Sequence, residues 1–210
     1  MTFTNLTINY GYANRASDPK AAKLAARRAE KKSVWDAKGN RPMPVFFTDG
    51  SFFLRKGQWQ GSYAIVYRVP HPTEDDYLVA RAYRLYAFCE DNNQAELMGI
   101  AEALATALPM FAGYDARGAT VKIFSDSTEA LKRIALGSTR FHEQTVRGKT
   151  CQWEDSVSYK KPMDWLMQPV VRVILDIVKK LGAMGVFVEL SWMKRNQTYS
   201  HRMADSLAGC

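Results

Sequence analysis

The chain has 210 residues, of which 47% are hydrophobic and 12% are aromatic, enough for one ordinary core. Its 29 Lys and Arg outweigh 21 Asp and Glu, and the resulting net charge of +8 attracts polyanions such as nucleic acid. The three scattered cysteines exclude a complete disulfide framework, and no apolar run approaches the roughly 18 residues of a membrane span. We therefore expect an intracellular protein, in the nucleus or the cytoplasm, that does not associate with a membrane.

The N-terminal part of the chain is basic. Residues 1–17 show no clear period, but Asp18-Pro19 is typical of a helix start and is followed by residues rich in alanine, lysine and arginine. This composition predicts a helix over about 18–32. We expect residues 1–41 to form a basic arm, which either touches phosphate or is a solvated helix or linker.

From Pro42 onward the pattern predicts an α/β domain over residues 42–210. Short runs of β-branched and aromatic residues predict three adjacent antiparallel strands, then two more strands separated by helices. The first strand is predicted within 45–53, where it enters a turn at Asp49-Gly50, and the others over 61–69, 76–88, 121–126 and 186–192. The helices are predicted over 93–108, 127–136 and 165–181, with a last one opening at Arg202. Residues 138–163 are polar and basic, and we expect a protruding loop or short helix there. A mixed sheet flanked by helices is the economical packing.

Four carboxylates fall at the edges of these elements: Asp49, Glu96, Asp126 and Asp205. Asp49 and Asp126 each follow an apolar strand, where burying a carboxylate is costly unless it is paired, protonated or bound to a cation. If the two strands are parallel neighbours, both carboxylates emerge on one side and a hard divalent ion would neutralise them. A cap or turn residue is the alternative interpretation for each of them, and the favoured one for Asp205 taken alone.

Four segments together resemble the successive motifs of type 1 ribonuclease H, from about Val45 to Leu207. They are FFTDGSF, DNNQAELMGIAEAL, VKIFSDS and HRMADSLAG, in the family's order and at roughly its spacing. The resemblance implies a ribonuclease H-like mixed five-stranded sheet, with three antiparallel strands followed by two parallel ones, flanked by helices.

The resemblance also implies a chemistry. Asp49, Glu96 and Asp126 would be the central metal ligands, and Asp205 matches the fourth carboxylate. Two Mg²⁺ ions, which Mn²⁺ would replace, would activate water and stabilise the reacting phosphate. The implied activity is cleavage of the RNA strand of an RNA–DNA hybrid, leaving 5′-phosphate and 3′-hydroxyl ends. The protein would act as a monomer or as one domain of a larger polyprotein.

Substrate contacts are expected at two places. An enzyme that cuts RNA must sense the 2′-hydroxyl in the minor groove, and the residues matching the family's asparagine pair precede Glu96. The candidates are Ser51, Asn92, Asn93 and Gln94, although asparagine is also a common helix cap. The basic insert over 138–163 falls where some relatives carry a substrate handle, and it is otherwise an ordinary solvated loop. Its candidates are Lys149, Lys160 and Lys161.

The sequence departs from the family pattern twice. Many members carry a histidine in the loop after the last strand, where Asn196 stands here. Either His201 takes over that role as a catalytic candidate, or the enzyme works more slowly without a histidine. The family's glycine-rich turn after the first strand is replaced by a bulkier hairpin, which presses Trp59 and two cations on the duplex or packs on the basic arm.

Three alternatives remain at this point. The first is a non-catalytic ribonuclease H-like binding module of a larger assembly such as a reverse transcriptase. The second is a nuclease or strand-transfer enzyme of the same superfamily that acts on DNA. The third is a basic α/β protein with accidental motifs. Retention of all four acidic positions argues against the first, since a binding platform gains nothing from carboxylates that face phosphate.

Overall fold

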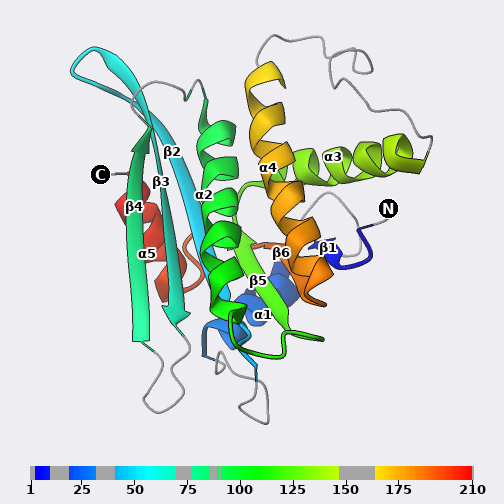
Figure 1. Ribbon diagram of the computed structural model, residues 1–210. Coiled ribbons are helices and arrows are strands. Elements are labelled where there is room, and N and C mark those ends of the chain that lie inside the picture. Colours follow the sequence, from blue (N-terminus) through cyan, green and yellow to red (C-terminus); the bar gives the residue numbers. More distant parts are fainter. Residues whose placement is uncertain are drawn as a thin grey trace.

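The computed structural model describes residues 3–9, 19–31, 41–69, 77–85, 89, 91–146 and 164–209. A single sheet runs through the molecule, with helices on both faces (Figure 1). The strands are β1 (Leu6–Asn9), β2 (Val45–Arg55), β3 (Gln58–Val69), β4 (Tyr77–Leu85), β5 (Thr120–Ser125) and β6 (Phe187–Trp192). The helices are α1 (Pro19–Lys31), α2 (Asn92–Ala107), α3 (Thr128–Val146), α4 (Asp164–Ala183) and α5 (Tyr199–Ala208), and a short 3-10 turn, η1, covers Leu108–Phe111.

The strand order is β1-β6-β5-β2-β3-β4. The strands β2, β3 and β4 are antiparallel, whereas β5 is parallel to both β2 and β6. This arrangement confirms the expected mixed sheet, in which three antiparallel strands are followed by two parallel ones.

The sheet has six strands rather than the expected five. The sixth, β1, pairs in parallel with β6 over the register Leu6↔Val188 to Asn9↔Ser191. It was missed because it has four residues, of which two are half-buried and two exposed, too few to show a period of two. The segment expected as a basic arm thus supplies an edge strand as well as the helix α1.

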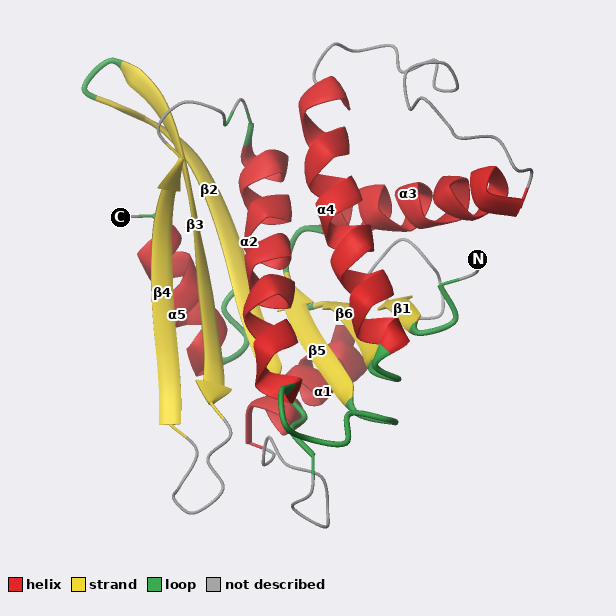
Figure 2. Cartoon of the chain, viewed as in Figure 1, coloured by secondary structure: helices red, strands yellow, loops and turns green. Residues whose placement is uncertain are grey.

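Helices cover both faces of the sheet (Figure 2). On the face of α2 and α4, the largest cluster of buried side chains joins Phe46, Leu97, Ile123 and Ile174. On the opposite face, α1 buries Ala26 in a cluster with Val45, Phe47, Phe124 and Met193, and α5 buries Ala204 and Ala208 against Ala64 and Val66. Successive residues of β2 therefore enter opposite layers, as the pleat of a strand requires.

Two helix boundaries differ from the prediction. Helix α3 continues to Val146, beyond the predicted end at residue 136, so the first part of segment 138–163, expected as a protruding loop or short helix, is helical. Polar and basic residues carry little apolar period, so the sequence did not indicate where the helix ends. Helix α5 begins at Tyr199, three residues before Arg202, because Thr198 caps it by accepting a hydrogen bond from the His201 backbone N–H. Lys149, Lys160 and Lys161 lie outside the described residues.

The hairpin between β2 and β3 ends in a two-residue turn. Lys56 and Gly57 both have positive φ, of 50° and 78°, which matches the twist of the flanking strands. Trp59 stacks on Phe52 with ring centroids 4.9 Å apart. The hairpin projects beyond the sheet, well away from α1, so it does not pack on this described helix of the arm (Figure 1).

Candidate active site

Asp49 is 1% exposed and lies within β2, so the turn predicted at Asp49-Gly50 is wrong: both residues pair with β3, and the strand continues to Arg55. The next residue, Gly50, is in direct contact with the backbone of α2, since a Cβ atom there would lie 2.3 Å from the backbone nitrogen of Glu96. Only glycine allows this approach without displacing the helix. The Asp-Gly pair therefore brings the carboxylates of Asp49 and Glu96 to the same place.

Glu96 and Asp126 complete the centre of the cluster. Glu96 is 3% exposed, and the hydroxyl of Ser125 at the end of β5 lies 3.5 Å from its Oε2. Asp126 follows directly after β5, and its backbone carbonyl accepts a hydrogen bond of 3.0 Å from the Trp192 indole N–H at the end of β6. Because β5 runs parallel to β2 beside it, Asp126 emerges next to Asp49, as the sequence predicted.

Helix α5 adds two further groups on one face, since His201 and Asp205 are four residues apart. One nitrogen of His201 and one carboxylate oxygen each of Asp49 and Asp126 all lie within 4.8 Å of one another. The structure thus brings together Asp49, Glu96, Asp126, Asp205 and His201, although they come from four separate segments of the chain.

Arg195, in the loop between β6 and α5, is the main residue of this site that sequence reasoning missed. Its guanidinium Nε lies 2.9 Å from Asp205 Oδ1 and 3.8 Å from Asp126 Oδ2, and its Nη2 lies 4.0 Å from Asp49 Oδ2. One cation therefore faces three carboxylates. The available signal was a pair of cations, Lys194 and Arg195, directly after the last strand.

The cluster perturbs the acidity of its own members. Burial, and then the charges of Asp126 and Asp205, raise the pKa of Asp49 to about 8. Burial, and then the charges of Asp49 and Asp126, raise the pKa of Glu96 well above its usual range, although the Gly50 backbone N–H and Arg195 oppose this shift. Burial lowers the pKa of His201, against the opposing charges of Asp126 and Asp205. Without a further cation, the site therefore favours protonated forms of Asp49 and Glu96, because Arg195 alone does not neutralise all of its carboxylates.

Several buried polar atoms of the cluster have no hydrogen-bond partner among the described residues: Asp49 Oδ2 and both ring nitrogens of His201. Buried polar atoms are nearly always paired, so these atoms indicate a missing positively charged ligand. Carboxylate oxygens suit Mg²⁺ and Mn²⁺, and the donor set fits a divalent metal ion. Asp49, Glu96, Asp126, Asp205 and His201 are the residues able to hold it.

The expected substrate-binding residues lie at the start of α2 and on β2. Asp91, rather than either asparagine, caps α2 by accepting hydrogen bonds from the Gln94 backbone N–H at 2.8 Å and from Asn93 Nδ2 at 3.3 Å. Asn92 is exposed, Asn93 and Ser51 are half-buried, and Gln94 is buried. Capping therefore does not explain the asparagines, and their contacts with substrate stay a prediction.

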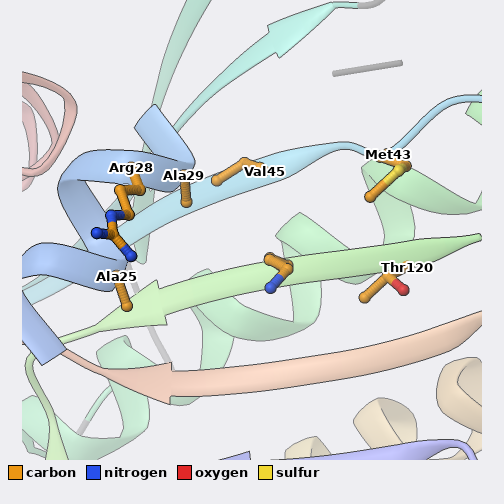
Figure 3. Close-up of a pocket in the computed structure, with 7 residues that line it drawn as sticks. Ala25, Arg28, Ala29, Met43, Val45 and Thr120 are labelled. Atoms are coloured by element: carbon orange, nitrogen blue, oxygen red, sulfur yellow. The ribbon is translucent and has the colours of Figure 1, made fainter. Parts of the chain in front are cut away.

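A separate pocket of about 260 Å³ lies between α1 and the sheet (Figure 3). It is lined by Ala25, Arg28, Ala29, Met43, Val45, Thr120 and Lys122. Lys122 already forms an ion pair of 2.7 Å with Glu189. The pocket contains none of the clustered carboxylates and is not part of the acidic site.

The mixed sheet flanked by helices is the architecture of an RNase H-like fold, with the acidic cluster buried where β2 and β5 lie side by side. The sequence profile of the RNase H family matches residues 42–209, and the chain belongs to this family, whose members act on RNA–DNA hybrids. No curated protein sequence matches the chain.

Solved structures of RNase H proteins are similar to the chain at low sequence identity. RNase H1 from Halobacterium salinarum is 17% identical, with a TM-score of 0.41, over 79% of this chain and 94% of that one. LC9-RNase H1, a type 1 RNase H with the type 2 active-site motif, is 20% identical, with a TM-score of 0.49, over 80% and 73%. The N-terminal RNase H domain of Rv2228c from Mycobacterium tuberculosis is 15% identical, with a TM-score of 0.40, over 78% and 98%. Within the described ranges, no helix is long and apolar enough to cross a membrane.

Proposed function

We propose that the protein is a metal-dependent endoribonuclease that cuts the RNA strand of RNA–DNA hybrids and leaves 5′-phosphate and 3′-hydroxyl ends. The convergence of Asp49, Glu96 and Asp126 in one buried cluster is the observation that carries the proposal. Clustered carboxylates with raised pKa values destabilise the folded protein, and such clusters are typical of functional sites.

Asp49, Glu96, Asp126 and Asp205 would hold two Mg²⁺ ions, which Mn²⁺ would replace. When bound, such ions activate the attacking water and neutralise the charge that develops on the phosphate. The chain's own contribution is rigidity. Asp49 is fixed within a strand and Glu96 within a helix that rests on Gly50, so neither carboxylate needs to reorganise when the ions and the substrate bind.

Choice of the RNA strand would depend on the start of α2. Asn92 is exposed and Asn93 is half-buried there, four and three residues before Glu96 respectively. Their amides offer both donors and acceptors to a 2′-hydroxyl in the minor groove, next to the phosphate that the acidic cluster faces. Ser51 lies two residues beyond Asp49 on β2 and would contact the same strand, whereas burial of Gln94 favours a supporting role for its side chain.

A non-catalytic binding module is the second candidate, and one observation favours it. Arg195 already faces Asp49, Asp126 and Asp205, so the chain supplies a cation of its own to three of the four carboxylates. A protein that never binds metal would need such a cation permanently.

One cleavage assay separates the two candidates. The protein is incubated with labelled RNA–DNA hybrid, single-stranded RNA or duplex DNA, in magnesium, manganese or chelator. We expect metal-dependent cutting of the hybrid's RNA strand only, and its loss in Asp126→Asn. The matched control is Asp176→Asn, an exposed carboxylate on α4, which should cut normally. Binding of the hybrid without cleavage would favour the module, and cleavage of DNA would favour a DNA-acting relative.

A further inference from the structure

His201 is the histidine of the acidic cluster, and it is fully buried, with an exposure of 0%. Among the described residues, neither of its ring nitrogens, Nδ1 and Nε2, has a hydrogen-bond partner. A histidine that only fills space normally directs at least one nitrogen to a carbonyl, a carboxylate or water. Its two vacant nitrogens inside an acidic cluster indicate a ligand.

The position of His201 is fixed by the cap of α5. Thr198 accepts a hydrogen bond of 3.1 Å from the His201 backbone N–H, which sets the first turn of the helix. The imidazole therefore enters the cluster from a rigid element, on the same helix face as Asp205. Such a placement suits a metal ligand, because the geometry is determined before the ion binds.

The distances are compatible with a shared ion. The ligand atoms of His201, Asp49 and Asp126 lie within 4.8 Å of one another. Two ligand atoms about 2.1 Å from one octahedral ion lie about 3 Å apart when adjacent and about 4.2 Å apart when opposite. An opposite pair would need to contract by about 0.6 Å or less, and an adjacent pair by about 1.8 Å or less.

We propose that His201 is a metal ligand together with Asp49 and Asp126, and that this mixed nitrogen and oxygen site selects Mn²⁺ or another transition-metal ion over Mg²⁺. This inference rests on the proposed function, because the ion would belong to the same acidic centre. Magnesium prefers oxygen ligands, whereas imidazole nitrogen suits transition metals, whose affinities rise from Mn²⁺ toward Cu²⁺. A site that includes His201 should therefore differ in metal preference from an all-carboxylate site.

Pulsed electron paramagnetic resonance of the Mn²⁺-loaded protein tests the ligand directly. We expect coupling of the manganese electron spin to an imidazole ¹⁴N nucleus, and its loss in His201→Asn, which offers an oxygen of similar reach. Calorimetric titration should show that the variant loses about tenfold or more in Mn²⁺ affinity and less than about threefold in Mg²⁺ affinity. Asp176→Asn, an exposed carboxylate on α4, is the control and should leave both affinities unchanged.

The outcomes separate this inference from the proposed function. Mn²⁺ that binds and supports cleavage without ¹⁴N coupling would overturn the role of His201 and leave the nuclease intact. Equal losses of Mg²⁺ and Mn²⁺ affinity in His201→Asn would also overturn it, since they would indicate a structural role. A wild-type protein that binds neither ion would overturn both proposals. The coupling measurement uses the wild-type chain and remains informative if the variant does not fold.

Discussion

The substitution Asp49→Asn should stabilise the metal-free protein while removing its response to metal. Burial and the neighbouring carboxylates of Asp126 and Asp205 raise the pKa of Asp49 from 3.8 to about 8. The folded protein therefore holds a proton that the unfolded chain releases. The stability that this proton contributes is complete below about pH 3.8 and is lost as the pH rises toward about 8.

The magnitude follows from the same shift. One pKa unit corresponds to about 1.4 kcal/mol, so holding Asp49 protonated at pH 7 opposes folding by at most about 4 kcal/mol. The cluster titrates as a unit, and an asparagine amide also requires partners, so we expect a gain of about 1 to 3 kcal/mol in Asp49→Asn. This trade of stability for function is common at active sites.

The assay is urea unfolding in chelator at about pH 5 and about pH 8, followed by thermal unfolding with magnesium. The wild-type protein should lose stability between these pH values, and Asp49→Asn should lose clearly less. Magnesium should raise the melting temperature of the wild-type protein but not that of Asp49→Asn. Asp176→Asn, exposed on α4, should behave like the wild type. An Asp49→Asn protein that is less stable than the wild type in chelator, or that magnesium still stabilises, would refute the reasoning.

Three further substitutions test the surroundings of the site. Gly50→Ala places a methyl group against the Glu96 backbone and displaces α2, so urea unfolding should show a free energy of unfolding that is lower by about 1 to 3 kcal/mol. Unchanged stability would contradict this packing. Arg195→Gln removes a cation that competes with metal, so calorimetry should show tighter Mg²⁺ binding, and weaker binding would contradict the competition. The free energy of unfolding in chelator should change by less than about 1 kcal/mol, because Arg195 is more than half exposed. Glu30 of α1 accepts a 2.6 Å hydrogen bond from the Ser200 N–H at the start of α5. Glu30→Ala should therefore cost about 1 kcal/mol of stability and speed hydrogen exchange of the Ser200 amide, whereas Glu30→Gln keeps an acceptor and should lose less. Equal exchange in both variants would count against the contact.

Elements with a strong apolar period were predictable from the sequence. The apolar face of α2 and the near-continuous apolar run of β5 both record burial within a single segment, so they required no tertiary information. Strand β1 is too short, and the second half of α3 too polar, for a local apolar pattern to predict either of them. Their positions depend on pairing with β6 and on helix continuation through polar residues, which a local pattern does not report.

The same distinction applies to the candidate site. The meeting of Asp49 and Asp126 was predictable because each stands beside an apolar strand, where burying a carboxylate is costly, whereas Glu96 was indicated by the family motif. Arg195 was not predictable, because its significance lies in distances to carboxylates at positions 49, 126 and 205, set by the loop after β6. His201 was a candidate for catalysis because it could take over the role of the family's loop histidine, and its complete burial suits a metal ligand instead.

The most direct test of the central claim is a cleavage time course on an RNA–DNA hybrid labelled in the RNA strand, comparing the wild-type protein with Glu96→Gln. Glu96→Gln keeps the shape of a 3% exposed side chain and removes one carboxylate from the cluster. We predict that the wild-type protein cuts the RNA strand in magnesium or manganese and not in chelator, and that Glu96→Gln is slower by at least about 100-fold. Cleavage that persists in chelator, or a Glu96→Gln protein as active as the wild type, would contradict a metal-dependent acidic centre.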